Sequence, residues 1–242
     1  MPATGAEQEF VVRNEAASVV LCGTLQTPDN VAPKALVVMA SGSGQQNRDE
    51  EIFGHKIFKD IADRLSCSGY ASLRLDDRGT GSSSGDFSKA TTDDFTDDIA
   101  CALKSVDSVF TDIPIGVLGH SEGGSVAIRL GAHNPLCEFI ITLAAPAWRG
   151  DSIIMSQARA LAENASGNWS AENATLQRRL LDICLSPIPS ALARPVFIST
   201  MTKEAGSAGT LPQVQASIAA SADAMLSKWY REFLRYDPSD DI

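Results

Sequence analysis

The chain has 242 residues, 44% of them hydrophobic, with a formal net charge of −10 and a pI near 4.7. An acidic surface repels phosphate backbones and anionic lipid headgroups, so we expect neither nucleic-acid nor membrane-surface binding. Residues 1–9 carry no apolar signal region, and no apolar run is long enough to span a bilayer. The five cysteines include no Cys-x-x-Cys pair, which favours reduced thiols and a cytoplasmic location unless a signal peptide has been removed.

Up to residue 144 the sequence alternates between strand and helix patterns. Residues 9–13 and 18–25 predict an antiparallel hairpin. Continuous apolar runs then predict buried strands, separated by segments with helical spacing. The predicted strands cover residues 35–40, 70–75, 115–118 and 139–144, and the predicted helices cover residues 52–66, 92–110 and 123–132. This order is typical of an α/β fold with a doubly wound, mostly parallel sheet.

After Pro146 the pattern becomes mostly helical. Predicted helices cover residues 152–164, 171–184 and 211–234. We therefore expect an α/β core over residues 1–148 and a helical insertion over residues 149–236. Residues 237–242 would begin the return to the core.

The strongest chemical motif is Gly119-His120-Ser121-Glu122-Gly123. It lies between a predicted strand and a predicted helix, as a nucleophile elbow requires. The serine of such an elbow takes a strained backbone conformation, and small residues two before and two after it avoid a clash between helix and strand. The sequence thus predicts Ser121 as the nucleophile, with Gly119, His120 and Gly123 shaping the elbow.

Two further motifs accompany the elbow in the expected order. They are Gly42-Ser43-Gly44-Gln45-Gln46-Asn47-Arg48-Asp49 and Asp76-Asp77-Arg78-Gly79-Thr80-Gly81-Ser82. With them, the sequence resembles the α/β-hydrolase superfamily, and most closely the bacterial carboxylesterases and serine aminopeptidase-like hydrolases. The resemblance is firm over residues 8–148 and looser beyond.

The resemblance implies an oxyanion hole formed by the backbone N–H groups of Ser43 and Glu122. It also implies that Asp77, Arg78, Arg48 and Asp49 shape the loops around the site. The helical insertion would be a cap. No metal or organic cofactor is implied.

The acid and the base of the triad are harder to find. In this fold they follow the serine, with the histidine last. The chain has His55, His120 and His133 only, and none fits that place. Glu204, after the strand-like run 195–198, is one conceivable acid.

The tail at 228–238 resembles the last cap helix of the family. We therefore expect a chain truncated before the last strands, with an exposed sheet edge that favours self-association.

Three functions remain open on the sequence. The first is a serine hydrolase that attacks carboxylic esters through Ser121 and is impaired because the acid and base are missing. Its substrate would be a small-molecule ester or a related acyl compound. The second is a non-catalytic binding protein that kept the pocket. The third is an active enzyme with an unusual base, either His55 or a group from a partner.

Overall fold

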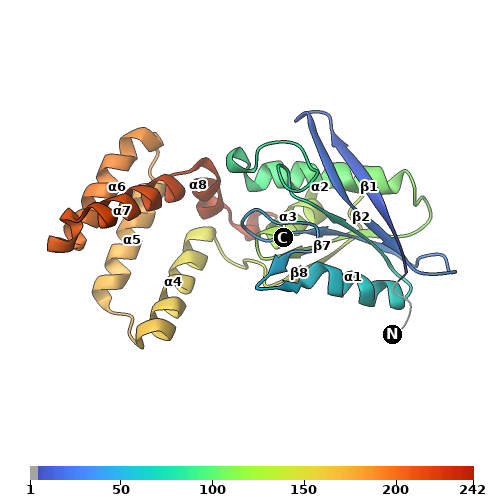
Figure 1. Cartoon of the computed structure of the whole chain (residues 1–242), viewed down its shortest axis with the longest axis horizontal. Coiled ribbons are helices and arrows are strands. Elements are labelled where there is room, and N and C mark those ends of the chain that lie inside the picture. The colour runs from blue at the N-terminus through green and yellow to red at the C-terminus, as the bar shows by residue number, and fades with distance from the viewer. Residues whose placement is uncertain (1–4) are drawn as a thin grey trace. The chain divides into compact units, whose positions relative to one another are not determined.

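The computed structural model describes residues 5–242 and divides them into two compact units (Figure 1). The α/β unit runs to Ala147 and takes in Pro238–Ile242, which includes the short helix η3 (Pro238–Asp240). The helical unit is Trp148–Asp237.

Over the described residues, the α/β unit has a six-stranded sheet in the order β1-β2-β6-β3-β7-β8. The pairs β1–β2 and β2–β6 are antiparallel, and the pairs β6–β3, β3–β7 and β7–β8 are parallel. The prediction of an α/β fold with a mostly parallel, doubly wound sheet is confirmed. The strands are β1 (Ala6–Asn14), β2 (Val19–Thr27), β3 (Leu36–Ala40), β6 (Ala71–Leu75), β7 (Ile115–His120) and β8 (Phe139–Leu143).

Helices cover both faces of this sheet: α1 (Ile57–Cys67) lies on one face, and α2 (Thr92–Asp107) and α3 (Glu122–His133) on the other (Figure 1). Strand β3 shows the alternation that results. Its Leu36 and Val38 pack in the core beneath α2 and α3, whereas Val37 and Met39 pack in the core beneath α1. A strand buried on both faces must be apolar throughout, which explains the continuous apolar run.

The strand order places the functional loops. The chain passes from β3 to β6 on one side through α1, and then from β6 to β7 on the other side of β3 through α2. The order therefore reverses between β3 and β7. In open α/β sheets, ligands bind outside the carboxyl ends of the strands at such a reversal. The loop after β3 and the turn after β7 both begin there.

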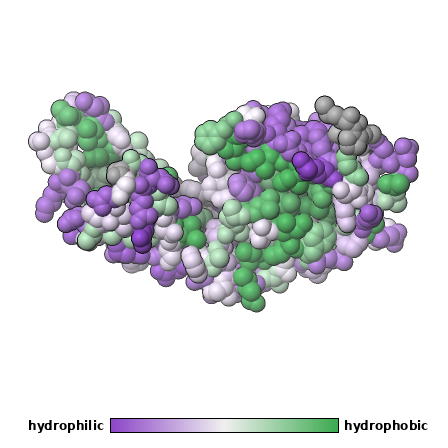
Figure 2. Space-filling model, turned by 90° about the horizontal axis from the view of Figure 1, so that it is seen from below, coloured by the Kyte–Doolittle hydropathy of each residue, from purple (hydrophilic) through white to green (hydrophobic). Residues whose placement is uncertain are grey.

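Strand β8 is an edge of the sheet and pairs with β7. Two of its apolar residues are substantially exposed, Ile140 at 40% and Ile141 at 38%. Figure 2 shows hydrophobic side chains gathered over the face of the α/β unit that is seen from below. This unit therefore presents both an open strand edge and apolar surface.

The largest boundary error in the α/β unit is at the start of α1. The helix expected from residue 52 begins at Ile57, because β4 (Glu51–Ile52) and β5 (His55–Lys56) form a small hairpin. The chain reverses at Phe53 and Gly54, which have positive φ angles of 52° and 80°. Helical periodicity in the following residues gives no sign of such a turn.

The helical unit packs its helices around a core of its own. Its fully buried residues include Leu181, Cys184, Phe197, Ala222 and Leu234. The helices are α4 (Gly150–Ser166), α5 (Ala171–Leu185), α6 (Ser190–Glu204), α7 (Pro212–Met225) and α8 (Lys228–Arg235), with a short η2 (Gly206–Thr210) before α7.

Two predictions for this unit are wrong. The run 195–198 is not a strand but part of α6, because Phe197 is buried among helices and this packing overrides the strand preference of Val196 and Phe197. The single helix expected over 211–234 is two helices. Ser227 separates them by capping α8, where its hydroxyl accepts a hydrogen bond from the N–H of Tyr230 at 3.2 Å.

None of the helices in residues 5–242 combines the length and the hydrophobicity that crossing a membrane requires.

Candidate active site

Ser121 lies in the turn between β7 and α3, with φ 50° and ψ −115°. This region is sparsely populated by residues other than glycine, and such strain concentrates at functional sites. The surrounding structure holds the turn on both sides. The Ser121 N–H donates to the carbonyl oxygen of Leu143, and the Ser121 carbonyl accepts from the N–H of Gly124, both at 2.9 Å.

The two glycines of the motif are required by backbone contacts. A Cβ on Gly119 would lie 1.9 Å from the carbonyl oxygen of Gly123, and one on Gly123 would lie 2.0 Å from that of Ala40. Both distances are far inside van der Waals contact. Helix α3 can therefore turn back over β7 and β3 only if neither position carries a side chain.

The loop after β3 meets this turn at Gly42. A Cβ on Gly42 would lie 3.3 Å from Cβ of Ser121. Ser43 follows and is exposed, and Gly44 has φ 96°, a conformation that favours glycine. The structure thus brings the predicted oxyanion loop against the predicted nucleophile.

Glu122 is the first residue of α3 and is buried. Its Oε1 accepts a hydrogen bond from the hydroxyl of Thr92 at 2.6 Å, so the side chain is engaged with α2. Its backbone amide lies at the N-terminus of α3, where the helix dipole favours an anion. The loop after β3 and the N-terminus of α3 therefore both lie beside Ser121.

The structure adds a residue that the sequence did not indicate, Glu50. Its side chain is completely buried, and its Oε1 accepts a hydrogen bond from the N–H of Gly42 at 2.7 Å. The same oxygen lies 2.8 Å from Nδ1 of His120. An isolated glutamate in a loop gives no sign of this role, because its partner His120 is 70 residues away in sequence.

Asp77, which follows β6, holds the same loop from another direction. Its Oδ1 accepts from the hydroxyl of Ser41 at 2.6 Å, and its Oδ2 accepts from the N–H of Gln46 at 2.8 Å. Burial raises the pKa of Asp77 to about 7, although the two hydrogen bonds act to lower it. The negative charges of Glu122 and Glu50 add to the rise.

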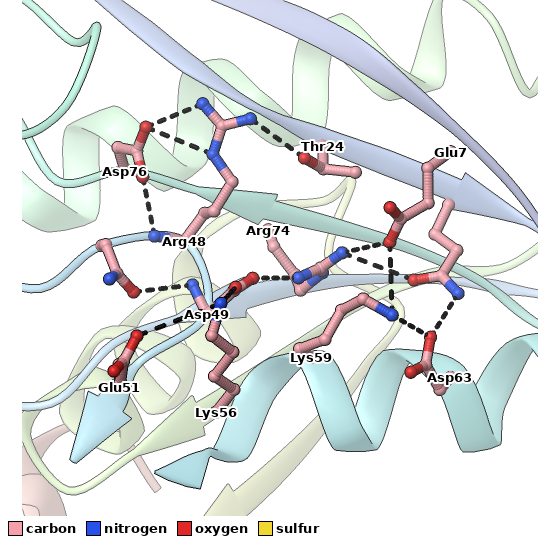
Figure 3. Close-up of polar contacts among 12 residues, drawn as sticks. Glu7, Thr24, Arg48, Asp49, Glu51, Lys56, Lys59, Asp63, Arg74 and Asp76 are labelled. Atoms are coloured by element: carbon pink, nitrogen blue, oxygen red, sulfur yellow. Dashed lines mark hydrogen bonds and ion pairs between the residues drawn. The ribbon is translucent and has the colours of Figure 1, made fainter. Parts of the chain in front are cut away.

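The far end of the loop is anchored by ion pairs (Figure 3). Arg48 pairs with Asp76 at 2.7 Å and donates to the hydroxyl of Thr24 at 2.9 Å. Asp49 pairs with Arg74, whose side chain is only 2% exposed. Hydrogen bonding to Asp76 raises the pKa of Arg48 above its ordinary value. Arg48 and Asp49 therefore fasten the loop to β6 and β2.

Arg78 fastens the loop after β6 to α2. Its Nε lies 2.8 Å from Oδ2 of Asp98, and its Nη2 donates to the carbonyl oxygen of Asp94 at 2.9 Å. Asn14 donates to the other oxygen of Asp98 at 2.8 Å. Arg78 thus has a structural role, because its contacts hold the loop after β6 against α2.

The three histidines lie in different places. His55 is exposed on the β4–β5 hairpin, and His120 contacts Glu50. His133 ends α3, and its Nε2 lies 2.7 Å from Oδ1 of Asp241. None of these contacts is to Ser121. Glu204 ends α6 in the helical unit and does not follow a strand, so the argument that made it a conceivable acid is wrong.

A cavity borders the loop after β3 within the α/β unit. Ser41, Gly42 and Asp77 line one part of it, and apolar side chains that include Phe95 and Val126 line another. Within residues 5–242, no group of three or more His, Cys, Asp or Glu side chains is arranged to hold a metal ion.

The chain is similar to several known hydrolases. A monoglyceride lipase homolog of monkeypox virus is 27% identical over 124 residues, which make up 50% of this chain and 41% of that protein. The α/β hydrolase GrgF from Penicillium sp. sh18 has a TM-score of 0.57 at 15% identity, over 98% of this chain and 75% of that one. The esterase Pf2001 from Pyrococcus furiosus has a TM-score of 0.53 at 20% identity, over 64% of this chain and 56% of that one.

This chain thus spans less than half of the length of the viral relative. Residues 31–194, which are 164 of the 242 residues, match the family described as serine aminopeptidase, S33. Together with the fold, this match shows that the chain belongs to the serine aminopeptidase S33 family of the α/β-hydrolase superfamily.

Proposed function

We propose that the protein is a serine hydrolase of carboxylic esters. Ser121 is its nucleophile, and the amides of Ser43 and Glu122 form its oxyanion hole. The observation that carries the proposal is the strained turn at Ser121, with Gly42 packed against the Ser121 Cβ. Strain of this kind costs roughly 1–3 kcal/mol and persists only where the surroundings enforce it.

The proposed reaction is acyl transfer. The Ser121 hydroxyl attacks the ester carbonyl, and negative charge develops on the carbonyl oxygen between the two loops. Preorganised amides stabilise that charge, and losing one such donor typically costs about 100- to 1000-fold in rate. The alcohol then leaves, and water hydrolyses the acyl-enzyme.

Activation of Ser121 limits the rate of the proposed reaction. A serine hydroxyl is a poor nucleophile unless a base removes its proton. The histidine contacts given above are to Glu50 and Asp241 and not to Ser121. We therefore propose that turnover by residues 1–242 alone is impaired. The oxyanion hole and substrate binding would leave a residual rate, as they do in hydrolases that lack triad members.

The proposed substrate is a small-molecule ester or a related acyl compound with a small to medium apolar group. The match to a family of serine hydrolases supports an ester or acyl substrate. The name of the viral relative adds monoglycerides as candidates. We propose that the helical unit acts as a substrate-selecting cap. The reduced thiols and acidic surface that the sequence indicates are the basis for proposing a cytoplasmic location.

We also propose that the open edge of β8 allows a second copy of the chain to associate. An edge strand presents unpaired backbone groups to other strands. Its exposed Ile140 and Ile141 add apolar surface.

The test is labelling with a fluorophosphonate probe together with hydrolysis of nitrophenyl esters and a monoglyceride. We expect slow labelling that Ser121→Ala abolishes. Ser82→Ala, which removes an exposed hydroxyl, is the matched control and should label as the parent does. Labelling at the rate of a complete serine hydrolase would favour an unusual base. Absence of labelling would overturn the proposal and favour the non-catalytic binding protein.

A further inference from the structure

Glu50 combines two features that cost free energy. Its carboxylate is completely buried, and burial of a charge is unfavourable unless the charge is paired and hydrogen-bonded. Its backbone has φ 46°, an uncommon conformation for a side chain of this size. A residue that only filled space would need neither feature.

The contacts of Glu50 explain what these features achieve. Its Oε1 accepts from the Gly42 N–H at 2.7 Å and lies 2.8 Å from Nδ1 of His120. Both distances are those of hydrogen bonds. Oε1 of Glu50 therefore connects Gly42, in the loop after β3, to His120, the residue before Ser121.

Other contacts hold the remainder of the loop. Asp77 binds Ser41 and Gln46, which lie on either side of the Gly42–Gly44 segment. Arg48 and Asp49 bind to Asp76 and Arg74 immediately before Glu50. The loop is thus fixed at its far end, and Glu50 reaches back from that fixed point to its beginning.

We infer that Glu50 is a positioning residue that holds the Ser43 amide at Ser121 by joining Gly42 to His120. The inference rests on the proposed function of Ser121. Oxyanion donors must be held within about 0.5 Å of their working position, and Gly42 precedes Ser43 directly. Glu50 itself does not touch the substrate in this account.

Two conservative variants distinguish the effect of the length of the Glu50 side chain from the effect of its charge. Glu50→Gln keeps an acceptor oxygen at the same distance and removes the charge. Glu50→Asp keeps the charge and shortens the side chain by one methylene group, so it cannot reach both partners. Glu51→Gln and Glu51→Asp make the same changes at the exposed neighbouring residue.

We expect Glu50→Asp to slow fluorophosphonate labelling of Ser121 by about 10- to 100-fold, below the loss of a whole oxyanion donor. Glu50→Gln should stay within a few fold of the parent, and both Glu51 variants should be unchanged. The loss should appear in the maximal labelling rate and not in probe binding. If Glu50→Gln labelled more slowly than Glu50→Asp, the inference would be overturned, because the charge of residue 50 would then matter more than the length of its side chain.

Hydrogen exchange keeps the inference testable if Ser121 does not label at all. In that case the proposed function fails, but hydrogen exchange at the Gly42 amide still measures the strength of its hydrogen bond to Glu50. We expect it to exchange faster in Glu50→Asp than in Glu50→Gln or Glu51→Asp, measured at matched stability. Equal exchange in all three proteins would show that Glu50 does not hold the loop.

Discussion

Asp77 lies in surroundings that oppose its ionisation. Burial raises its pKa from the ordinary value of 3.8 to about 7, and the charges of Glu122 and Glu50 act in the same direction. A folded-state pKa above the unfolded value means that the folded protein binds the proton more tightly. Between about pH 4 and pH 7 the contribution of Asp77 to the stability of the folded state therefore falls as the pH rises.

We predict that Asp77→Asn flattens this dependence. The full shift of about three units corresponds to at most roughly 4 kcal/mol in the free energy of unfolding. Urea unfolding from pH 4.5 to 7.5 measures it. Far-UV circular dichroism is the suitable probe, because Trp148, Trp169 and Trp229 all lie in the helical unit. Asp60→Asn removes an exposed carboxylate and should leave the slope unchanged. A parent protein with the same slope as Asp77→Asn would contradict the prediction.

The residues of the elbow could be predicted because the physics that selects them is local. A Cβ at Gly119 or Gly123 would clash with backbone atoms of the five-residue turn or of the adjacent β3, so the spacing of these glycines is visible in the sequence. Glu50 could not be predicted. Its partners are Gly42 and His120, and nothing near Glu50 in sequence records the contact with a residue 70 positions away.

At the scale of elements, the buried strands are determined by their local sequence, whereas some helices and turns depend on contacts with distant residues or on unusual backbone angles. The apolar runs of β3 and β7 predict their own burial, since each is covered on both faces. The sequence does not predict α6, because Val196 and Phe197 favour strands and the residues that bury Phe197 belong to α5 and α7. It does not predict the turn at Phe53, because that turn depends on two positive φ angles.

The Arg78–Asp98 pair is one of the contacts that join the loop after β6 to α2. Both side chains are almost fully buried, with 8% and 5% exposed. We predict that Arg78→Met lowers the free energy of unfolding by about 3–5 kcal/mol, because it leaves Asp98 buried beside a neutral side chain. Urea unfolding followed by circular dichroism measures the change.

The double variant Arg78→Met with Asp98→Leu should be more stable than Arg78→Met alone, since it removes both charges together. Arg159→Met is the matched control, because Arg159 forms an exposed ion pair with Glu163 and should change stability by less than about 1 kcal/mol. A cost for Arg78→Met as small as that of Arg159→Met would show that the buried pair does not hold the loop.

At the scale of the whole molecule, the sheet has two different edges. Strand β1 is twisted into a long hairpin with β2 and carries mostly polar, exposed residues. Strand β8 carries Ile140, Ile141 and Thr142 in exposed positions. Charged residues on an edge discourage pairing with another chain, and β8 has none. The two edges therefore differ in their tendency to associate.

We predict that the protein self-associates through β8 and that Ile141→Lys prevents it. Sedimentation velocity of the parent should show a coefficient that rises with concentration, because a second copy can pair with the open edge and cover Ile140 and Ile141. A lysine at position 141 adds a charge that would be desolvated in such a contact, so the coefficient should stay at the monomer value. Val109→Lys makes the same replacement at an exposed residue beyond α2 and should associate as the parent does. A parent protein that remains a monomer at every concentration would show that the edge alone does not drive association, and loss of association in Val109→Lys would place the contact elsewhere.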